Sequence, residues 1–151
     1  MRREAFVWAA ALVLLSGLVV AEGRRRTALE AELPVFAPEL YRLIARAGPG
    51  VQVVDLRDAA DSEDARVPGA IPMPGCDPAA VPASARGRLV PSLPTVLVTP
   101  TGDRADARRC AGRFPSARLL GGGMRAWSDA GLPEDAGAYA PPAARAGGGC
   151  L

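Results

Sequence analysis

The sequence of 151 residues contains no histidine and no lysine, so all 18 of its basic side chains are arginines. Without histidine, this chain alone supplies neither a serine–histidine or cysteine–histidine nucleophile pair nor a histidine-ligated metal. Its three cysteines, Cys76, Cys110 and Cys150, are too few and too irregularly spaced for a zinc knuckle or a disulfide scaffold. We therefore expect no metal site and no cofactor.

The net charge is also small once the N-terminus is set aside. Five of the 18 arginines lie within the first 26 residues, where two glutamates oppose them. Past residue 26, 13 arginines face 14 acidic residues, so the remainder of the chain carries a net charge of about −1. Because this part has no basic stripe, we expect no binding to nucleic acid.

One long apolar run is present, the uncharged stretch Ala5–Ala21 between Arg2-Arg3 and Arg24–Arg26. As a helix it would be about 25 Å long at ~1.5 Å per residue, slightly shorter than a ~30 Å hydrocarbon core. Three arginines directly after the run resist translocation, which favours an uncleaved signal anchor over a cleaved signal peptide. We expect a single-pass membrane anchor. A secreted or periplasmic protein after cleavage is the alternative, and either membrane face remains open.

Helical and strand patterns alternate after this segment. Short apolar, β-branched runs bounded by turn residues predict strands at 51–55, 95–98 and 117–120, with a further short strand after the Pro68-Gly69 turn. Amphipathic helical patterns lie between them. The sequence therefore predicts an α/β fold with a mainly parallel sheet flanked by helices, preceded by one N-terminal hydrophobic helix.

The chain divides into four parts on these grounds. We expect residues 1–26 to be the membrane anchor or signal segment, 27–33 a charged connector and 34–135 one α/β domain. Residues 136–151 are dominated by alanine, glycine and proline, which predicts a disordered tail.

A polar loop follows the apolar strand at 95–98 and leads into a helical pattern. It consists of Thr99, Pro100, Thr101, Gly102, Asp103 and Arg104. Such a junction gathers backbone N–H groups and the positive end of a helix dipole, and therefore suits an anion or a thiolate. We interpret it as an anion-binding loop. A loop that only connects the strand to the helix is the alternative.

Five segments, taken in order, resemble the signatures of a rhodanese-like domain. They are Val53–Arg57, Val67–Ile71, Thr99–Arg104, Leu120–Trp127 and Gly131–Pro133. The resemblance implies the rhodanese fold, a parallel sheet between helices. In active members it also implies a sulfurtransferase that carries sulfur as a cysteine persulfide.

The same resemblance assigns positions within the loop. Thr99 stands where the family has its catalytic cysteine, and Gly102 and Arg104 match the end of the family's loop. Arg66 stands where the family often has a histidine. Asp55 and Arg57 end a strand on the same face, where we expect a structural pair that supports the loop.

Threonine at position 99 predicts a pseudoenzyme. A persulfide needs a sulfur nucleophile, and a threonine hydroxyl has no general base here to activate it. We therefore expect a membrane-anchored binding or regulatory module for a small anion, a sulfur species or a protein partner.

The alternative is a sulfurtransferase that uses Cys76 or a partner's thiol. Cys76 follows a strand in a turn, where we expect an exposed thiol, whereas Cys110 lies on an apolar helix face and is expected to be buried. Whether these two cysteines form a disulfide depends on their distance, which the sequence does not give.

Overall fold

The structure, a computed structural model, describes residues 16–17, 33–46 and 50–142. Nearly all of the predicted N-terminal hydrophobic helix and connector therefore lies outside the described residues. Within the described ranges, no helix is long and apolar enough to cross a membrane.

Four parallel strands form the centre of the domain, in the order β2-β1-β3-β4. They are β1 (Gln52–Asp55), β2 (Ile71–Pro72), β3 (Thr95–Val98) and β4 (Ala117–Leu119). Every neighbouring pair is parallel, and Val54 of β1 aligns with Ile71 on one side and Leu97 on the other. The prediction of a parallel α/β sheet is confirmed, and the predicted strand positions agree with the structure to within a residue or two.

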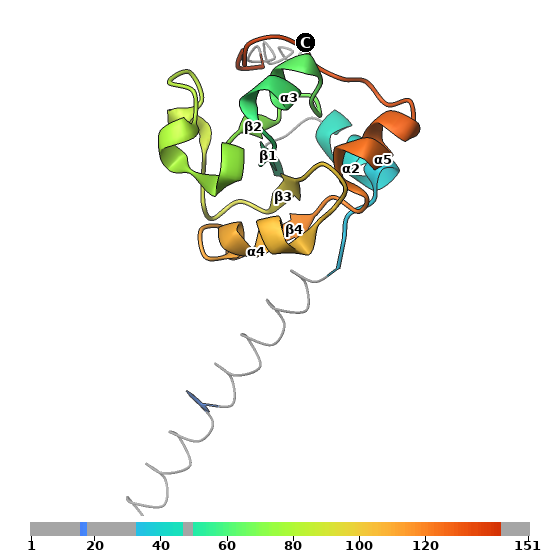
Figure 1. Ribbon diagram of the computed structural model, residues 1–151. Coiled ribbons are helices and arrows are strands. Elements are labelled where there is room, and N and C mark those ends of the chain that lie inside the picture. The colour runs from blue at the N-terminus through green and yellow to red at the C-terminus, as the bar shows by residue number, and fades with distance from the viewer. Residues whose placement is uncertain (1–15, 18–32, 47–49, 143–151) are drawn as a thin grey trace, which may run out of the picture.

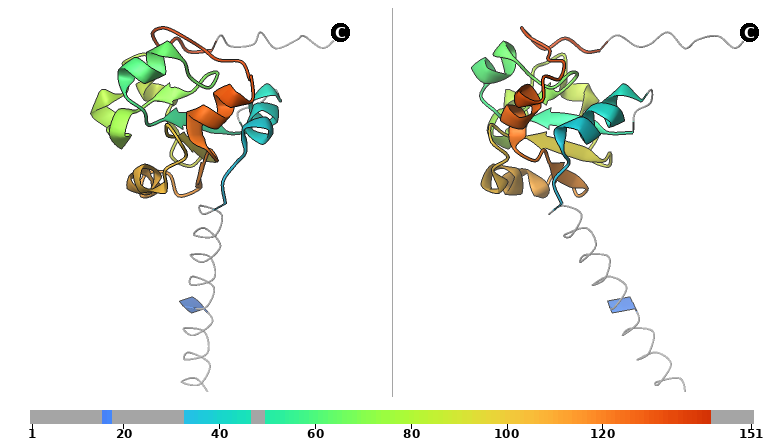
Figure 2. Two further views of the ribbon diagram at one scale, coloured as in Figure 1. Left: turned by 45° about the vertical axis from the view of Figure 1, so that its right-hand side comes forward. Right: turned by 90° about the vertical axis from the view of Figure 1, so that its right-hand side faces the viewer.

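Helices cover both faces of this sheet. The α-helices are α2 (Ala37–Ala45), α3 (Ala59–Asp64), α4 (Arg104–Ala111) and α5 (Gly123–Asp129). Three short 3-10 helices follow β2, namely η1 (Pro74–Cys76), η2 (Pro78–Ala80) and η3 (Arg86–Arg88). Figures 1 and 2 show α2 and α5 side by side, apart from α4 and the segment of 3-10 helices.

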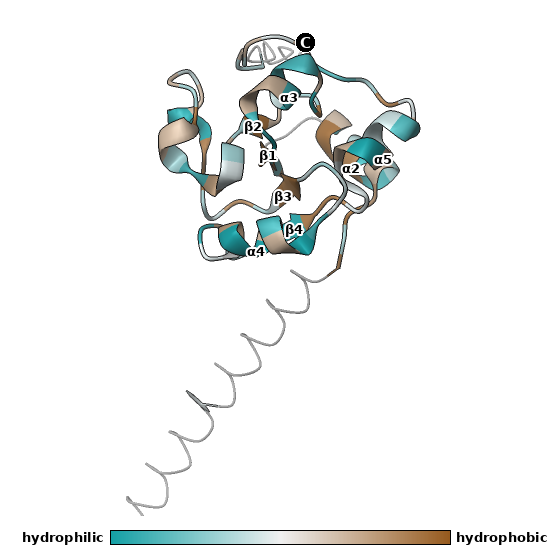
Figure 3. Ribbon diagram, in the orientation of Figure 1, coloured by the Kyte–Doolittle hydropathy of each residue, from teal (hydrophilic) through white to brown (hydrophobic). Residues whose placement is uncertain are grey.

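The core has two halves because successive strand side chains point to opposite faces. Val53 and Val96 pack with Leu40 of α2 and Trp127 of α5. Val54 and Leu97 pack on the other face, in a cluster that contains Met73, Cys76, Cys110 and Phe114. Both faces of β1 and β3 are buried, as expected for parallel strands covered by helices, and Figure 3 shows apolar colours on β3.

The segment after α5 packs against the domain further than the sequence predicts. Disorder was expected from residue 136, yet Gly137 donates its N–H to the Glu63 carbonyl at 2.6 Å, and the Tyr139 side chain packs against the core. The Ser84 hydroxyl also donates to the Tyr139 carbonyl at 3.4 Å. Alanine- and glycine-rich composition suggested disorder because it offers little apolar area, but the Tyr139 side chain and hydrogen bonds at Gly137, Ala138 and Tyr139 tie this segment to the domain. Residues 143–151 lie outside the described part.

Candidate functional site

The candidate loop lies at the carboxyl edge of the sheet, where ligand sites of open α/β sheets occur. Thr99 follows β3 directly, and Asp55 ends the neighbouring β1. The Leu56 N–H donates to the Val98 carbonyl at 2.9 Å, so the ends of these two strands are hydrogen-bonded to each other. The structure thus brings the loop and the predicted supporting pair to one edge.

Thr99 is completely buried, and its hydroxyl is engaged within the loop. Its Oγ1 accepts the N–H of Gly102 at 2.9 Å. The hydroxyl therefore closes the turn of the loop. A side chain with no exposed surface presents no nucleophile to a substrate.

The glycine-rich turn before α5 packs directly against the loop. A Cβ atom on Gly123 would lie 2.2 Å from the Thr99 carbonyl oxygen and 2.5 Å from the Gly102 nitrogen, and Gly123 has a φ of +61°. The N–H groups of Met124 and Arg125 donate to the carbonyls of Thr99 and Pro100, at 2.9 and 3.1 Å. The N–H groups in the first turn of α5 therefore bond to carbonyls of the loop and are not available to an external anion.

The N-terminus of α4 is capped by an acidic side chain of the loop. The Asp103 carboxylate accepts the N–H of Ala105 at 2.7 Å. This carboxylate occupies the place at a helix N-terminus that an external anion would otherwise take. Thr101 and Arg104 are exposed on the same loop. Anion binding there stays a prediction.

Asp55 and Arg57 form a buried ion pair with two parallel hydrogen bonds. Arg57 Nε and Nη2 donate to the two Asp55 oxygens at 3.0 and 2.7 Å, and the Arg57 backbone N–H adds a third bond at 3.1 Å. Arg57 also donates to the Ala65 carbonyl. This geometry fixes the chain as it leaves β1, which fits the predicted supporting role.

Arg66 contacts the C-terminal segment, and none of its contacts is with Thr99. Its guanidinium is almost completely buried, donates to the carbonyls of Ser62 and Gly137 at 3.1 and 2.5 Å, and lies 5.9 Å from the centre of the Tyr139 ring. The buried Arg66 Nε and Ser62 Oγ have no hydrogen-bond partner among the described residues. Burial raises the pKa of the Tyr139 hydroxyl, while the charges of Arg88 and Arg66 oppose this shift.

Cys76 and Cys110 form a disulfide that links η1 to α4, with their Cα atoms 5.6 Å apart. Cys110 is completely buried, as expected from the sequence. The expectation of an exposed Cys76 is wrong, because only 8% of it is exposed and its sulfur is bonded. Sequence spacing could not reveal this pair, since the two residues are 34 positions apart and meet only through the fold.

In the described part of the chain, no group of three or more cysteine or acidic side chains is placed to hold a metal ion. The features that remain are the parallel sheet, the strand–loop–helix junction at its carboxyl edge, and the buried acid–arginine pair. They define an α/β domain whose parallel sheet lies between helices and carries a polar loop at its carboxyl edge. A family model of the rhodanese-like domain matches residues 36–130, and the chain belongs to this family.

Solved structures agree with this assignment at the level of the fold. A protein from Bacillus halodurans has a TM-score of 0.58 and 21% identity, over 77% of this chain and 85% of that one. A rhodanese-related protein from Thermoplasma volcanium has a TM-score of 0.53 and 17% identity, over 68% and 96%. A thiosulfate sulfurtransferase from Pseudomonas aeruginosa has a TM-score of 0.56 and 24% identity, over 69% and 19%. No curated protein matches the chain significantly.

Proposed function

We propose that this protein is a rhodanese-like pseudoenzyme, attached to a membrane by residues 5–21, that acts as a binding or regulatory module. The observation that carries the proposal is Thr99. The resemblance to the family assigns it to the cysteine position, and in the structure it is completely buried and has its oxygen engaged by the Gly102 N–H. Sulfur transfer through a persulfide needs a sulfur atom at this place.

The hydroxyl does not offer a substitute chemistry. A threonine nucleophile requires a base within hydrogen-bonding distance, and the sequence contains no histidine. The hydrogen-bond partner of the Thr99 oxygen is an N–H donor, which cannot accept the hydroxyl proton. The loop therefore retains the family's shape without its nucleophile.

The alternative enzyme, a sulfurtransferase that uses Cys76, is disfavoured by the disulfide. A thiolate is the nucleophile in thiol chemistry, and both sulfurs of the Cys76–Cys110 pair are bonded to each other. Activity through Cys76 would first require a reductant. The disulfide also supports an oxidising compartment for the domain, since such bonds are rare in reducing ones.

The contacts of the loop favour a protein partner over a small anion. The N-termini of α4 and α5, the natural anion sites, are occupied by the Asp103 carboxylate and by loop carbonyls. The exposed surface of the loop comprises Pro100, Thr101, Asp103 and Arg104. These side chains include one carboxylate and one guanidinium.

Sulfur-transfer assays on the purified protein test the proposal. Oxidised and reduced protein are each given thiosulfate and a thiol acceptor, with Cys76→Ser and Cys150→Ser as matched variants. We expect no transfer above the uncatalysed rate in either redox state. Transfer by the reduced protein that disappears in Cys76→Ser and persists in Cys150→Ser would establish the alternative.

A further inference from the structure

A cavity of about 580 Å³ opens at the edge of the sheet opposite to Thr99. Its apolar lining includes Val35, Leu43, Val51 and Val96, from the start of the domain, α2 and the starts of the central strands. Arg46 and Arg118 also line it. An apolar hollow with guanidinium groups fits a surface that presents both hydrocarbon and negative charge.

Exposed apolar side chains are concentrated in the stretch of sequence that contributes to this cavity. Among the described residues, four of the five large hydrophobic side chains that are exposed lie between positions 33 and 43. Leu33 is 59% exposed and Phe36 is 62% exposed, and Leu43 itself lines the cavity. Leu33 lies beside the cavity-lining Arg118, which bonds its carbonyl, whereas the Phe36 ring lies near Gly121. Single exposed apolar residues are ordinary, but exposed apolar residues beside an apolar cavity mark an interaction site.

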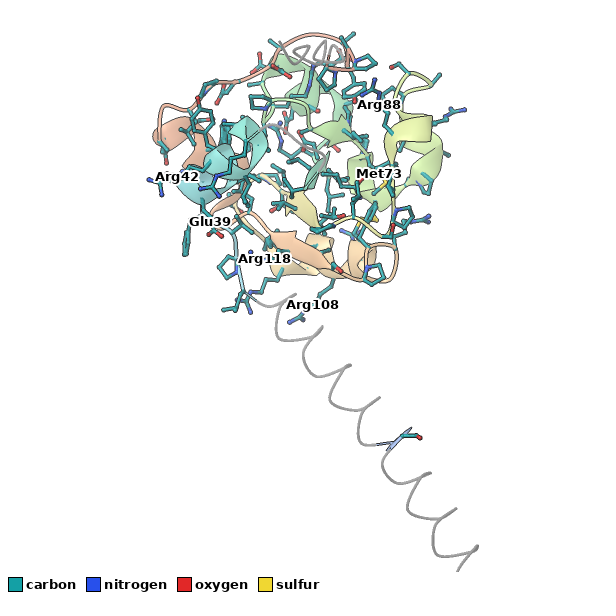
Figure 4. All side chains as sticks on the ribbon, turned by 180° about the vertical axis from the view of Figure 1, so that it is seen from behind. Glu39, Arg42, Met73, Arg88, Arg108 and Arg118 are labelled. Carbon is teal, nitrogen blue, oxygen red and sulfur yellow. A yellow bond between two sulfur atoms is a disulfide. The ribbon has the colours of Figure 1, made fainter. Side chains whose placement is uncertain are left out.

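The two arginines of the cavity differ in their interactions. The exposed Arg46 side chain forms no hydrogen bond or ion pair with another described residue. Arg118 donates to the carbonyls of Leu33 and Pro34 at 3.2 Å each and lies 3.8 Å from the half-exposed Glu39 carboxylate. Figure 4 shows Arg118 and Arg108 at the border of the domain where the described chain starts, and Arg88 at the opposite border.

We propose that this surface, defined by Leu33, Leu43, Arg46 and Arg118, docks onto an anionic lipid surface. The two apolar side chains enter the interfacial layer, and the two guanidiniums bind lipid phosphates. The inference rests on the proposed membrane attachment and adds an orientation to it.

The length of the preceding chain supports a lipid surface as the occupant. Eleven residues separate the end of the apolar run at Ala21 from Leu33. Even fully extended, they reach about 40 Å at ~3.3–3.6 Å per residue, so the docking surface is held close to the bilayer at a high effective concentration. Docking by this edge turns the Thr99 loop, at the opposite edge of the sheet, towards a soluble partner.

The test uses the full chain reconstituted in vesicles that contain a spin-labelled quencher lipid. A thiol-reactive fluorophore is attached in a Cys150→Ser background, where the Cys76–Cys110 disulfide leaves no other thiol. One protein carries Leu43→Cys, and the matched control carries Arg88→Cys. Vesicles of phosphatidylcholine alone are compared with vesicles that also contain phosphatidylglycerol.

We expect quenching at position 43 in vesicles with phosphatidylglycerol, less in phosphatidylcholine alone, and little at position 88. Each arginine near an anionic surface contributes ~1 kcal/mol to docking. Arg46→Gln should therefore lower the ratio of docked to undocked domain about fivefold, and Arg46→Gln together with Arg118→Gln should lower it about thirtyfold. Arg46→Gln is the safer variant for folding, because the Arg46 side chain forms no hydrogen bond or ion pair with another described residue.

Two results would overturn the proposal in distinguishable ways. Equal quenching at both positions, or none at either, in protein that resists extraction by alkaline carbonate would leave the attachment standing and remove the docked orientation. Protein that carbonate extracts from the vesicles would remove the attachment and, with it, the docking.

Discussion

The Thr99 hydroxyl and the Gly102 N–H form the hydrogen bond that closes the candidate loop, at 2.9 Å. Because Thr99 is completely buried, Thr99→Val would leave this N–H without its partner. We expect the free energy of unfolding to fall by about 1–3 kcal/mol, the cost of an unsatisfied buried donor. Urea denaturation measures the change.

Thr101→Val is the matched control for this change. Thr101 lies on the same loop but is exposed, and no hydrogen bond of its hydroxyl to a described residue is present. Its replacement should change the stability by less than about 0.5 kcal/mol. Equal losses from the two substitutions would show that the Thr99 hydroxyl has no special role in the loop.

Tyr139 gives the folded domain a dependence on alkaline pH. Burial raises the pKa of its hydroxyl above the ordinary value of 10.0, so folding favours the protonated form. The resulting stabilisation is fully present below pH 10 and is lost as the pH rises through the folded-state pKa. Tyr139→Phe should therefore flatten the decline of stability above about pH 10, measured by urea denaturation across that range. A decline of unchanged steepness in Tyr139→Phe would assign it to other groups.

Local motifs predicted some residues of the site and missed others for a physical reason. The Asp55–Arg57 pair could be predicted because its two residues stand two positions apart at the end of one strand. The role of Thr99 stays a prediction. The environments of Arg66 and Tyr139 could not, since they arise where the C-terminal segment crosses a distant turn. The disulfide was missed in the same way.

The turn that opens α5 packs closely against the loop that precedes α4, because Gly123 has no side chain between them. Gly123→Ala would place a methyl group 2.2 Å from the Thr99 carbonyl, at a φ of +61°. Backbone atoms on both sides cannot yield as a flexible side chain would. We expect a loss of at least about 2 kcal/mol, in the range of strain stored at such sites, measured by thermal or urea unfolding.

Gly87→Ala is the matched control, because a Cβ there would meet nothing within 4 Å. It should leave the stability within about 0.5 kcal/mol of the natural protein. If Gly123→Ala behaved like Gly87→Ala, the close packing of the loop on α5 would be incorrect.

The disulfide ties two elements that flank the same half of the core. It joins η1, after β2, to α4, after the candidate loop, across 34 positions of sequence. A loop of this length predicts a contribution of about 3–4 kcal/mol through the unfolded chain. Dithiothreitol should lower the midpoint of thermal unfolding by roughly 10–20 °C. A Cys76→Ala/Cys110→Ala variant should unfold near the midpoint of the reduced protein and not respond to the reductant.

At the scale of the whole molecule, the sequence was sufficient to predict the fold class but not the packing of the C-terminal segment against the domain. Short β-branched runs alternating with amphipathic patterns determine a parallel sheet almost uniquely, because parallel strands need crossover connections. The packing of residues 136–142 depends on one aromatic side chain and on hydrogen bonds to distant carbonyls, which composition does not encode. Membrane attachment remains a prediction from residues 5–21.

The flanking arginines and the disulfide favour opposite sides of the membrane for the domain. The disulfide is the stronger argument. Arg24–Arg26 favour retention of the domain on the cytoplasmic side, but Arg2, Arg3 and the α-amino group nearly balance them. A disulfide that stabilises the domain by several kcal/mol persists only where thiols are oxidised. We therefore expect the domain on the oxidising side.

In cells quenched with acid, a maleimide reagent added before reduction should label Cys150 alone, and Cys76 and Cys110 should react only after reduction. Labelling of all three cysteines before reduction would place the domain in a reducing compartment, where Cys76 regains a thiol and the sulfurtransferase alternative regains its nucleophile.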